Sequence, residues 1–232
     1  YSGLPTVLKE NGYYNLFFMT HEGQYDNMNA FFRTNGYDEV FSQEDYPADK
    51  VVNSFGVQDD FLYDYAIPVL NQRAATGEPF FATLLSISNH PPYVIPPFFH
   101  PKTSEPETQI VEYADWALRQ FFEEARKQPW FDNTIFVLEG DHGKLVGDAE
   151  CELPESYNHI PLMIYSSRIQ PEEKTTFGGQ VDIQPTILGL LNIDYLQNNF
   201  GVDLLKEERP CMFYTADNMI VGRNDTLLYL YN

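Results

Sequence analysis

Residues 136–143 read Phe-Val-Leu-Glu-Gly-Asp-His-Gly and contain the strongest structural signal in this 232-residue chain. An apolar run typical of a buried strand leads directly into Asp-His-Gly. In open α/β sheets, ligands bind beyond the carboxyl ends of the strands. Asp141 offers a hard oxygen ligand and His142 an imidazole nitrogen, and glycines let the backbone approach an ion. We interpret Asp141 and His142 as metal ligands; the alternative is a polar turn that caps the next segment.

Outward from this motif, short apolar strands alternate with helical patterns. The pattern predicts strands at residues 13–19, 37–41, 80–87, 134–138 and 160–165, and helices at residues 4–11, 27–34, 57–73, 107–127 and 181–191. This alternation predicts an α/β fold of three layers (α/β/α), with a mostly parallel sheet between helices. Short strands at residues 212–215, 219–221 and 227–231 predict a small antiparallel C-terminal region. Without a repeat or a linker, residues 1–232 are predicted to form one domain.

Some elements carry more detailed expectations. Strand 80–87 is a continuous apolar run and is predicted to be a central strand. Helix 57–73 should bend or divide at Pro68, and helix 181–191 should begin with Asp182 as its N-cap. The apolar residues expected on the buried side of helix 57–73 are Phe61, Tyr65, Val69 and Leu70. For helix 107–127 they are Val111, Ala114, Leu118, Phe121 and Ala125.

The composition excludes several partners. The net charge of -20 arises from 34 acidic and 14 basic residues, so a broad basic face for nucleic acid or for an anionic bilayer is not expected. An anionic substrate would need a local positive centre, which a bound divalent metal supplies. No apolar run approaches the roughly 18 residues of a membrane span. Cys151 and Cys211 are either two free thiols or a disulfide.

Two further histidines lie at the ends of predicted strands. His90 follows strand 80–87, so it is expected at the same sheet edge as Asp141 and His142. The alternative for His90 is a structural role. His159 directly precedes strand 160–165, which places it at the opposite edge unless that strand is antiparallel; both placements stay open.

The order of short motifs resembles the sulfatase-like branch of the alkaline phosphatase superfamily, and within it the lipoteichoic acid synthase and phosphoglycerol transferase group. The resemblance covers nearly the whole chain. The matching motifs are, in chain order, LPTVL (4–8), NGY (11–13), NHPPY (89–93), GDHG (140–143), HIPL (159–162), DIQPT (182–186) and FGVDL (200–204).

This resemblance implies one divalent metal ion, manganese or magnesium, or calcium if the protein is a sulfatase. In the family a Glu, a nucleophilic Thr and an Asp-His pair hold the ion, so Asp141 and His142 are implied ligands. His90 is implied to be catalytic, contacting the phosphoryl group or protonating a leaving oxygen. The Glu and Thr precede the segment that matches this chain. We therefore expect a partial catalytic domain that lacks its nucleophile and is inactive alone.

The implied substrate is an anionic lipid or sugar ester with a phosphoglycerol phosphodiester. The implied parent protein is extracytoplasmic, in the periplasm or on the outer face of the cytoplasmic membrane, and is anchored through upstream segments. The family's Trp-x-Arg pair is absent from residues 21–29. His21, Asn27 and His159, with His90, are therefore the expected substrate-binding residues, although Asn27 could instead cap a helix. A sulfatase on the same scaffold and a non-catalytic relic domain that binds sugar or lipid stay open.

Overall fold

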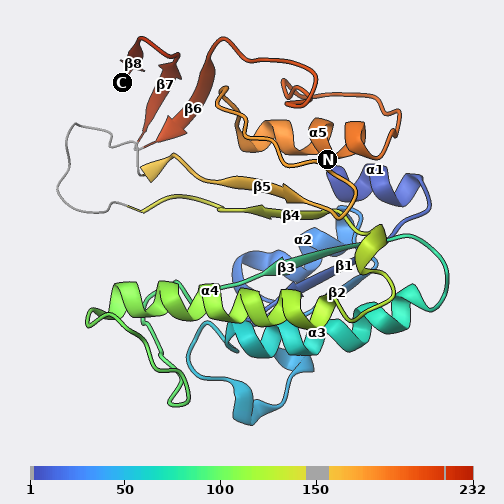
Figure 1. Cartoon of the computed structure of the whole chain (residues 1–232), viewed down its shortest axis with the longest axis vertical. Helices are drawn as coiled ribbons and strands as arrows, with labels where there is room; N and C mark the ends of the chain where they lie inside the picture. The colour runs from blue at the N-terminus through green and yellow to red at the C-terminus, as the bar shows by residue number, and fades with distance from the viewer. Residues whose placement is uncertain (1–2, 145–156, 217, 232) are drawn as a thin grey trace. The chain divides into compact units, whose positions relative to one another are not determined.

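The computed structural model describes residues 3–144, 157–216 and 218–231, and its chain divides into two compact units, Tyr1–Phe131 and Asp132–Asn232. Each unit has its own sheet and helices (Figure 1). The prediction of one domain is not tested by this division and stays a prediction. Unit 1 contains α1 (Leu4–Glu10), β1 (Tyr14–Met19), α2 (Met28–Thr34), β2 (Glu39–Phe41), α3 (Asp59–Ala74), β3 (Phe80–Leu85) and α4 (Pro106–Ala125). Unit 2 contains β4 (Phe136–Glu139), β5 (Leu162–Tyr165), α5 (Ile183–Leu190), β6 (Met212–Ala216), β7 (Met219–Arg223) and β8 (Leu228–Tyr231).

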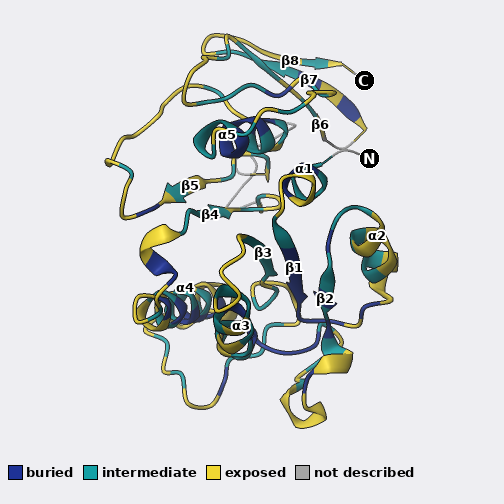
Figure 2. Cartoon of the chain, turned by 90° about the vertical axis from the view of Figure 1, so that its right-hand side faces the viewer, coloured by how far each residue is buried: buried dark blue, intermediate teal, exposed yellow. Residues whose placement is uncertain are grey.

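The sheet of unit 1 is parallel and has the strand order β2-β1-β3. β1 pairs with β3 over six residues, from Tyr14 opposite Phe80 to Met19 opposite Leu85. β1 is also the most buried of the three strands (Figure 2). β3 was predicted to be central. Within unit 1 it pairs with β1 and is half-buried along its length, and its central position stays a prediction.

Helices pack on both faces of this sheet because successive side chains of a strand point to opposite faces. On one face, the Phe17 ring of β1 stacks on Phe32 of α2 with the ring centroids 3.9 Å apart. On the other face, Phe18 stacks on Phe41 at 4.8 Å. Phe41 in turn lies 5.8 Å from Tyr65 of α3. The predicted three-layer α/β/α arrangement is confirmed in unit 1.

The buried side of α3 differs from the prediction. Leu70 is buried as expected, but the other buried apolar residues of α3 are Leu62, Tyr63 and Ala66. The difference arises because α3 is covered by α4 as well as by the sheet: the Tyr63 ring lies 5.3 Å from Phe121 of α4.

Pro68 does not divide α3, which runs unbroken from Asp59 to Ala74. Proline removes the hydrogen bond to the carbonyl four residues earlier, here that of Asp64. Both residues are exposed, so water can take the place of the missing donor.

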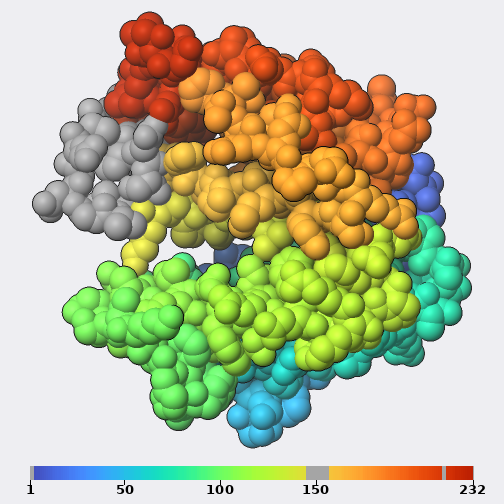
Figure 3. Space-filling view, in the orientation of Figure 1, coloured from blue at the N-terminus to red at the C-terminus, as the bar shows by residue number. Residues whose placement is uncertain are grey.

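α4 is an amphipathic helix whose buried side begins one residue earlier than predicted. Val111 was expected to be buried but is 52% exposed. Phe121 and Ala125 are buried as predicted, and the buried set at three- and four-residue spacing is Ile110, Tyr113, Ala117, Phe121 and Ala125. The opposite side of α4 forms a continuous surface in the space-filling view (Figure 3).

In unit 2, β4 and β5 pair antiparallel, from Phe136 opposite Tyr165 to Glu139 opposite Leu162. β6, β7 and β8 form a second antiparallel sheet, which confirms the predicted C-terminal region. Cys151 lies outside the described residues, so its pairing with Cys211 stays untested. Among the described helices of both units, none is long and apolar enough to cross a bilayer.

A tight turn at Gly56 packs against the end of β1. Val57 N–H donates to the Thr20 carbonyl over 3.1 Å, and Gly56 has a φ of +88°. A Cβ at residue 56 would lie 1.7 Å from the Thr20 oxygen. Only glycine permits both this φ and this approach.

We predict that Gly56→Ala destabilises the protein by more than about 3 kcal/mol, because it combines φ strain with a backbone clash. Gly77→Ala is the matched control, since Gly77 has a φ of +78° and a Cβ there meets nothing within 4 Å. It should cost only about 1 kcal/mol. Urea unfolding measures the free energy of unfolding of both variants. Equal losses in the two would contradict the prediction, because they would show that the backbone near Thr20 moves away from the added Cβ at no cost.

Candidate active site

His21 and His90 lie at one edge of the unit 1 sheet. His21 follows β1 and His90 follows β3, and these strands are parallel neighbours. A row of aromatic rings connects the two: His21 to Tyr25 at 4.9 Å, Tyr25 to Phe55 at 6.4 Å, and Phe55 to His90 at 4.2 Å between centroids. His21 is 2% exposed, whereas His90 is exposed. The structure therefore brings together two of the predicted site residues, one buried and one open to solvent.

A buried carboxylate holds the segment that carries His90. Asp59, 2% exposed at the start of α3, accepts hydrogen bonds from the N–H groups of Ile87 (2.9 Å) and Ser88 (3.0 Å). Its own N–H donates to the Ser88 hydroxyl oxygen over 3.1 Å. The His90 N–H then donates to the Ile87 carbonyl over 2.8 Å, which closes a turn. Sequence reasoning missed Asp59, whose only signal was its position in the first turn of a predicted helix.

Three histidines share one hydrogen-bond arrangement. Nδ1 of His90 lies 2.7 Å from the Pro91 carbonyl oxygen, Nδ1 of His142 lies 2.8 Å from that of Gly143, and Nδ1 of His21 lies 3.1 Å from that of Glu22. In each case the carbonyl accepts, so Nδ1 carries the proton and Nε2 of the neutral ring keeps its lone pair. For exposed His90 and His142, that nitrogen can bind an ion or exchange a proton.

A carboxylate from the segment after β2, that of Glu44, lies against the segment after β1, in which the family resemblance implies an arginine. Glu44 accepts from the Gly23 N–H at 3.1 Å and from the Ser42 hydroxyl at 2.7 Å. Partial burial acts to raise the pKa of Glu44, but these hydrogen bonds and the nearby His21 together hold that pKa below its usual value. The surroundings of His21 therefore hold a negative charge at neutral pH.

Asn27 is exposed at the start of α2, with a φ of +59°. Its side chain makes no capping hydrogen bond, so the capping alternative is wrong. The predicted role of Asn27 in substrate binding stays a prediction.

Asp141 and His142 follow the carboxyl end of β4 in unit 2, as predicted. Asp141 Oδ2 lies 3.5 Å from His142 Nε2, and the two side chains are 77% and 74% exposed. The His142 N–H donates to Asp141 Oδ1 over 2.9 Å. Gln180 stabilises this turn, because its side-chain amide donates hydrogen bonds to the backbone carbonyls of Asp141 (2.8 Å) and Gly140 (3.2 Å). Adjacent, accessible oxygen and nitrogen atoms of this kind fit a divalent metal ion.

The antiparallel pairing of β5 settles which end of the sheet holds His159. Glu139 at the end of β4 lies opposite Leu162 at the start of β5, so His159 emerges at the same end as Asp141. The two segments are close, because a Cβ on Gly140 would lie 3.3 Å from the side chain of Ile160. The contribution of His159 to substrate binding stays a prediction.

Asp182 is a fully buried anchor of unit 2. Its carboxylate accepts from the N–H groups of Gly179 (2.9 Å) and Val202 (2.8 Å) and from the guanidinium of Arg209, whose Nη2 lies 2.6 Å away. Asp182 is the N-cap residue of α5, as predicted, but its side chain makes no capping hydrogen bond to that helix. Instead, Asp182 ties residues 200–204 to the segment that contains Gln180.

Within residues 3–144, 157–216 and 218–231, no group of three or more His, Cys, Asp or Glu side chains is arranged to hold a metal ion. Among the described residues, Asp141 and His142 are thus the two predicted ligands, and their binding of an ion stays a prediction. His90 belongs to unit 1 and this pair to unit 2. Their meeting at one site stays a prediction.

Comparison with known proteins supports the resemblance to the sulfatase-like branch of the alkaline phosphatase superfamily. Residues 1–193 match the sulfatase family. Lipoteichoic acid synthase 1 of Bacillus subtilis is 27% identical over 231 residues, covering 90% of this chain and 36% of the relative. The chain thus spans about a third of the length of the curated relatives it matches.

Two solved structures confirm the predicted fold class. A protein in the alkaline phosphatase superfamily from Vibrio parahaemolyticus superposes with a TM-score of 0.88 at 30% identity, covering 98% of this chain and 57% of that one. The lipoteichoic acid synthase LtaP from Listeria monocytogenes superposes with a TM-score of 0.79 at 25% identity, covering 96% and 65%.

We predict opposite effects for two substitutions of Asp59. Asp59→Ala leaves the Ile87 and Ser88 N–H groups without their acceptor and should cost about 1–3 kcal/mol. Asp59→Asn keeps an acceptor oxygen and removes a buried charge. Burial raises the pKa of Asp59, so its stabilising contribution is present at low pH and is lost as the pH rises through the folded-state pKa.

Asp59→Asn should therefore gain stability relative to the wild type as the pH rises above about 4, the ordinary pKa of an aspartate. Urea unfolding at several pH values measures this difference. If Asp59→Asn instead lost as much unfolding free energy at pH 7 as Asp59→Ala, the negative charge of Asp59 would itself hold the His90 segment.

We also predict that Arg209→Ala destabilises unit 2 by about 3–5 kcal/mol, because it leaves the Asp182 carboxylate buried without its cation. Lys206→Ala is the control: Lys206 pairs with Asp203 over 2.9 Å but is 68% exposed, so its loss should cost less than about 1 kcal/mol. Denaturant unfolding followed by the tyrosine signals of the C-terminal sheet distinguishes the two, and similar small losses would contradict the anchoring role of Asp182.

Proposed function

Because the chain belongs to the sulfatase family, we propose that the protein containing it is a metal-dependent transferase or hydrolase of phosphoglycerol phosphodiesters. The observation that carries this proposal is the accessible pair of Asp141 and His142 at the carboxyl end of β4. The similarity to lipoteichoic acid synthases of Bacillus subtilis and Listeria monocytogenes supports the substrate class.

In this proposal, Asp141 and His142 hold one divalent ion through a carboxylate oxygen and Nε2. Manganese or magnesium suits this mixed oxygen and nitrogen set, and calcium is the expected ion if the enzyme is a sulfatase. When bound, the ion lowers the pKa of the attacking hydroxyl and offsets charge on the phosphoryl oxygens. The remaining ligands and the Thr nucleophile come from outside these 232 residues. Gln180 keeps the two ligands together by holding the carbonyls of the same turn.

His90 acts as the proton donor for the leaving oxygen in this mechanism. Its Nδ1 proton is held by the Pro91 carbonyl, so Nε2 is the atom that gains and gives the transferred proton. Asp59 fixes the turn from which the ring projects. His21, Asn27 and His159 contact the substrate.

The substrate is an anionic lipid or sugar ester, and its negative charge is met by the ion because the chain itself has a net charge of -20. We place the protein outside the cytoplasm, in the periplasm or on the outer face of the cytoplasmic membrane, anchored by segments beyond this chain. The same acidic surface opposes binding to nucleic acid.

A sulfatase is the second candidate. The absence of Trp and Arg from residues 21–29, together with the negative charge of Glu44 beside His21, favours a substrate other than phosphatidylglycerol.

We predict that the longer protein containing this chain cleaves a phosphoglycerol phosphodiester when manganese is present. Asp141→Ala and His90→Ala should each lower the rate at least 100-fold. Manganese binding, measured by calorimetry, should be lost in Asp141→Ala and kept in His90→Ala, because Asp141 is a proposed ligand and His90 is not. Asp115→Ala is the control, since Asp115 is 73% exposed on α4, and it should change neither quantity.

Each other outcome identifies an alternative. Turnover of sulfate esters without turnover of phosphodiesters would establish the sulfatase. A longer protein that neither binds manganese nor turns over either ester would be the non-catalytic relic.

A further inference from the structure

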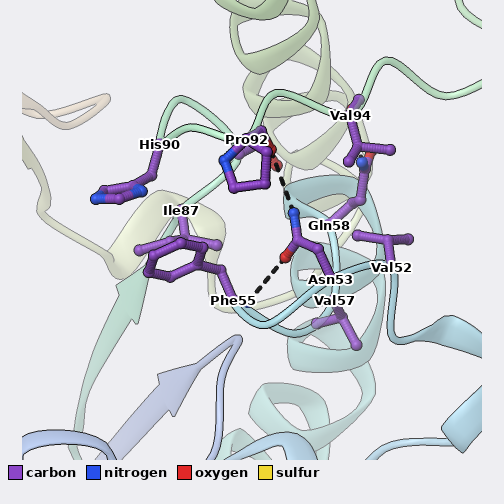
Figure 4. Close-up of a pocket in the computed structure, with 10 residues that line it drawn as sticks. Val52, Asn53, Phe55, Val57, Gln58, Ile87, His90, Pro92 and Val94 are labelled. Atoms are coloured by element: carbon purple, nitrogen blue, oxygen red, sulfur yellow. Dashed lines mark hydrogen bonds between the residues drawn. The ribbon is translucent and has the colours of Figure 1, made fainter.

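The small pocket beside His90 in unit 1 has room for about one water molecule (Figure 4). Asn53, Phe55 and His90 are among the residues that line it. This pocket is therefore too small to enclose a ligand. The surface of unit 2 offers a different feature, in the segment that follows α5 (Figure 1).

Leu196 and Phe200 in this segment are the most exposed large apolar side chains of the described residues, at 89% and 93%. Single apolar residues on a protein surface are common, but these two lie four positions apart in one short loop. Burying such a side chain is favourable by about 1.5–3 kcal/mol. The loop therefore presents apolar surface that a partner can cover with a gain in free energy.

Hydrogen bonds hold this loop in one conformation. The Gln197 side-chain amide donates to the Asn199 carbonyl over 3.2 Å and to the Gly201 carbonyl. Its oxygen accepts from the Tyr195 hydroxyl over 3.1 Å. The Gly201 N–H donates to the Asn199 side-chain oxygen over 2.9 Å. The polar groups of the loop thus keep its backbone ordered while its apolar side chains stay in solvent.

The end of the loop is tied to the buried carboxylate of Asp182. The Val202 N–H donates to this carboxylate over 2.8 Å. Arg209, which pairs with the same carboxylate, also donates to the Phe200 carbonyl. The fold of unit 2 therefore orders the loop before any partner arrives, and a preformed loop loses little conformational entropy on binding.

The loop carries no charge. Residues 195–202 read Tyr-Leu-Gln-Asn-Asn-Phe-Gly-Val, although 21% of the chain is charged and its net charge is -20. This segment is therefore a part of the acidic chain that can approach an anionic or zwitterionic surface without repulsion from its own side chains.

The size of the apolar surface favours a bilayer over a protein partner. An aromatic side chain buries about 150–250 Å², so two side chains supply much less than the roughly 800 Å² per partner of a stable protein interface. A bilayer accepts apolar side chains one at a time, and tyrosine is enriched at the level of its headgroups.

We propose that residues 195–202 form a preformed, uncharged loop that inserts Leu196 and Phe200 into the surface of a lipid bilayer. The choice of a lipid partner rests in part on the proposed function, because a lipid ester substrate lies in such a bilayer. Insertion depends on apolar side chains rather than on charge, so it persists at high salt.

The test uses the longer protein that contains this chain, reconstituted into phosphatidylcholine vesicles. 4-Fluorophenylalanine at position 200 is followed by its fluorine NMR signal, and lipids with a nitroxide at the headgroup level broaden this signal where the loop inserts. Broadening is expected at position 200, at low and at high salt. The same label in place of Phe31, which is 50% exposed on α2, is the control and should not be broadened.

Leu196→Asn replaces one of the two apolar side chains with a polar one. It should lower the ratio of inserted to free loop at least about 10-fold, because the bilayer no longer gains the transfer of a leucine side chain. Leu205→Asn is the matched control: Leu205 is 42% exposed and lies outside the loop, so its substitution should leave the ratio unchanged.

Three results would overturn the proposal. The first is no broadening at position 200, and the second is equal broadening at positions 200 and 31. The third is a signal at position 200 that a water-soluble gadolinium chelate cannot reach in the absence of lipid, because another protein segment then covers the loop. None of the three measures turnover, so a loop that inserts in a protein without activity would reject the proposed function and not the insertion.

Discussion

The parallel pairing of β1 with β3 is the constraint on which the candidate site of unit 1 depends. Their six-residue register places the ends of both strands at one edge, and from there His21 and His90 emerge. A shift by one residue would turn every side chain of a strand to the other face and would separate Phe17 from α2. Aromatic packing on both faces therefore maintains the register, and the register maintains the spacing of the two histidines.

Buried carboxylates play the same part in both units. Asp59 lies at the start of α3 and accepts the N–H groups of Ile87 and Ser88, which are distant in sequence. Asp182 lies directly before α5 and accepts the N–H of Gly179 in the preceding turn and that of the distant Val202. A buried carboxylate is stable only when such donors, or a cation such as Arg209, surround it. Each therefore requires its neighbouring segment to hold one conformation. In unit 1 that segment leads to His90, and in unit 2 it leads to Gln180 and the Asp141 turn.

Most elements could be predicted from periodicity and from the positions of glycine and proline. The helices and strands lie within a few residues of their expected ranges, because these signals act locally. The buried sides of α3 and α4 were less predictable. Val111 fits an amphipathic pattern but is exposed, and Tyr63 is buried against Phe121. The contact between α3 and α4 decides which side of each helix is buried, and it joins residues far apart in the chain.

The sequence by itself determined which residues follow the strands: His90 after β3, and Asp141 with His142 after β4. Strand ends carry this information because apolar runs and the polar turns behind them are local in the chain. Only the tertiary structure decided that β5 runs antiparallel to β4 and brings His159 to the end that holds Asp141. Strand direction and burial depend on contacts between residues far apart in the chain, and no local pattern reports them.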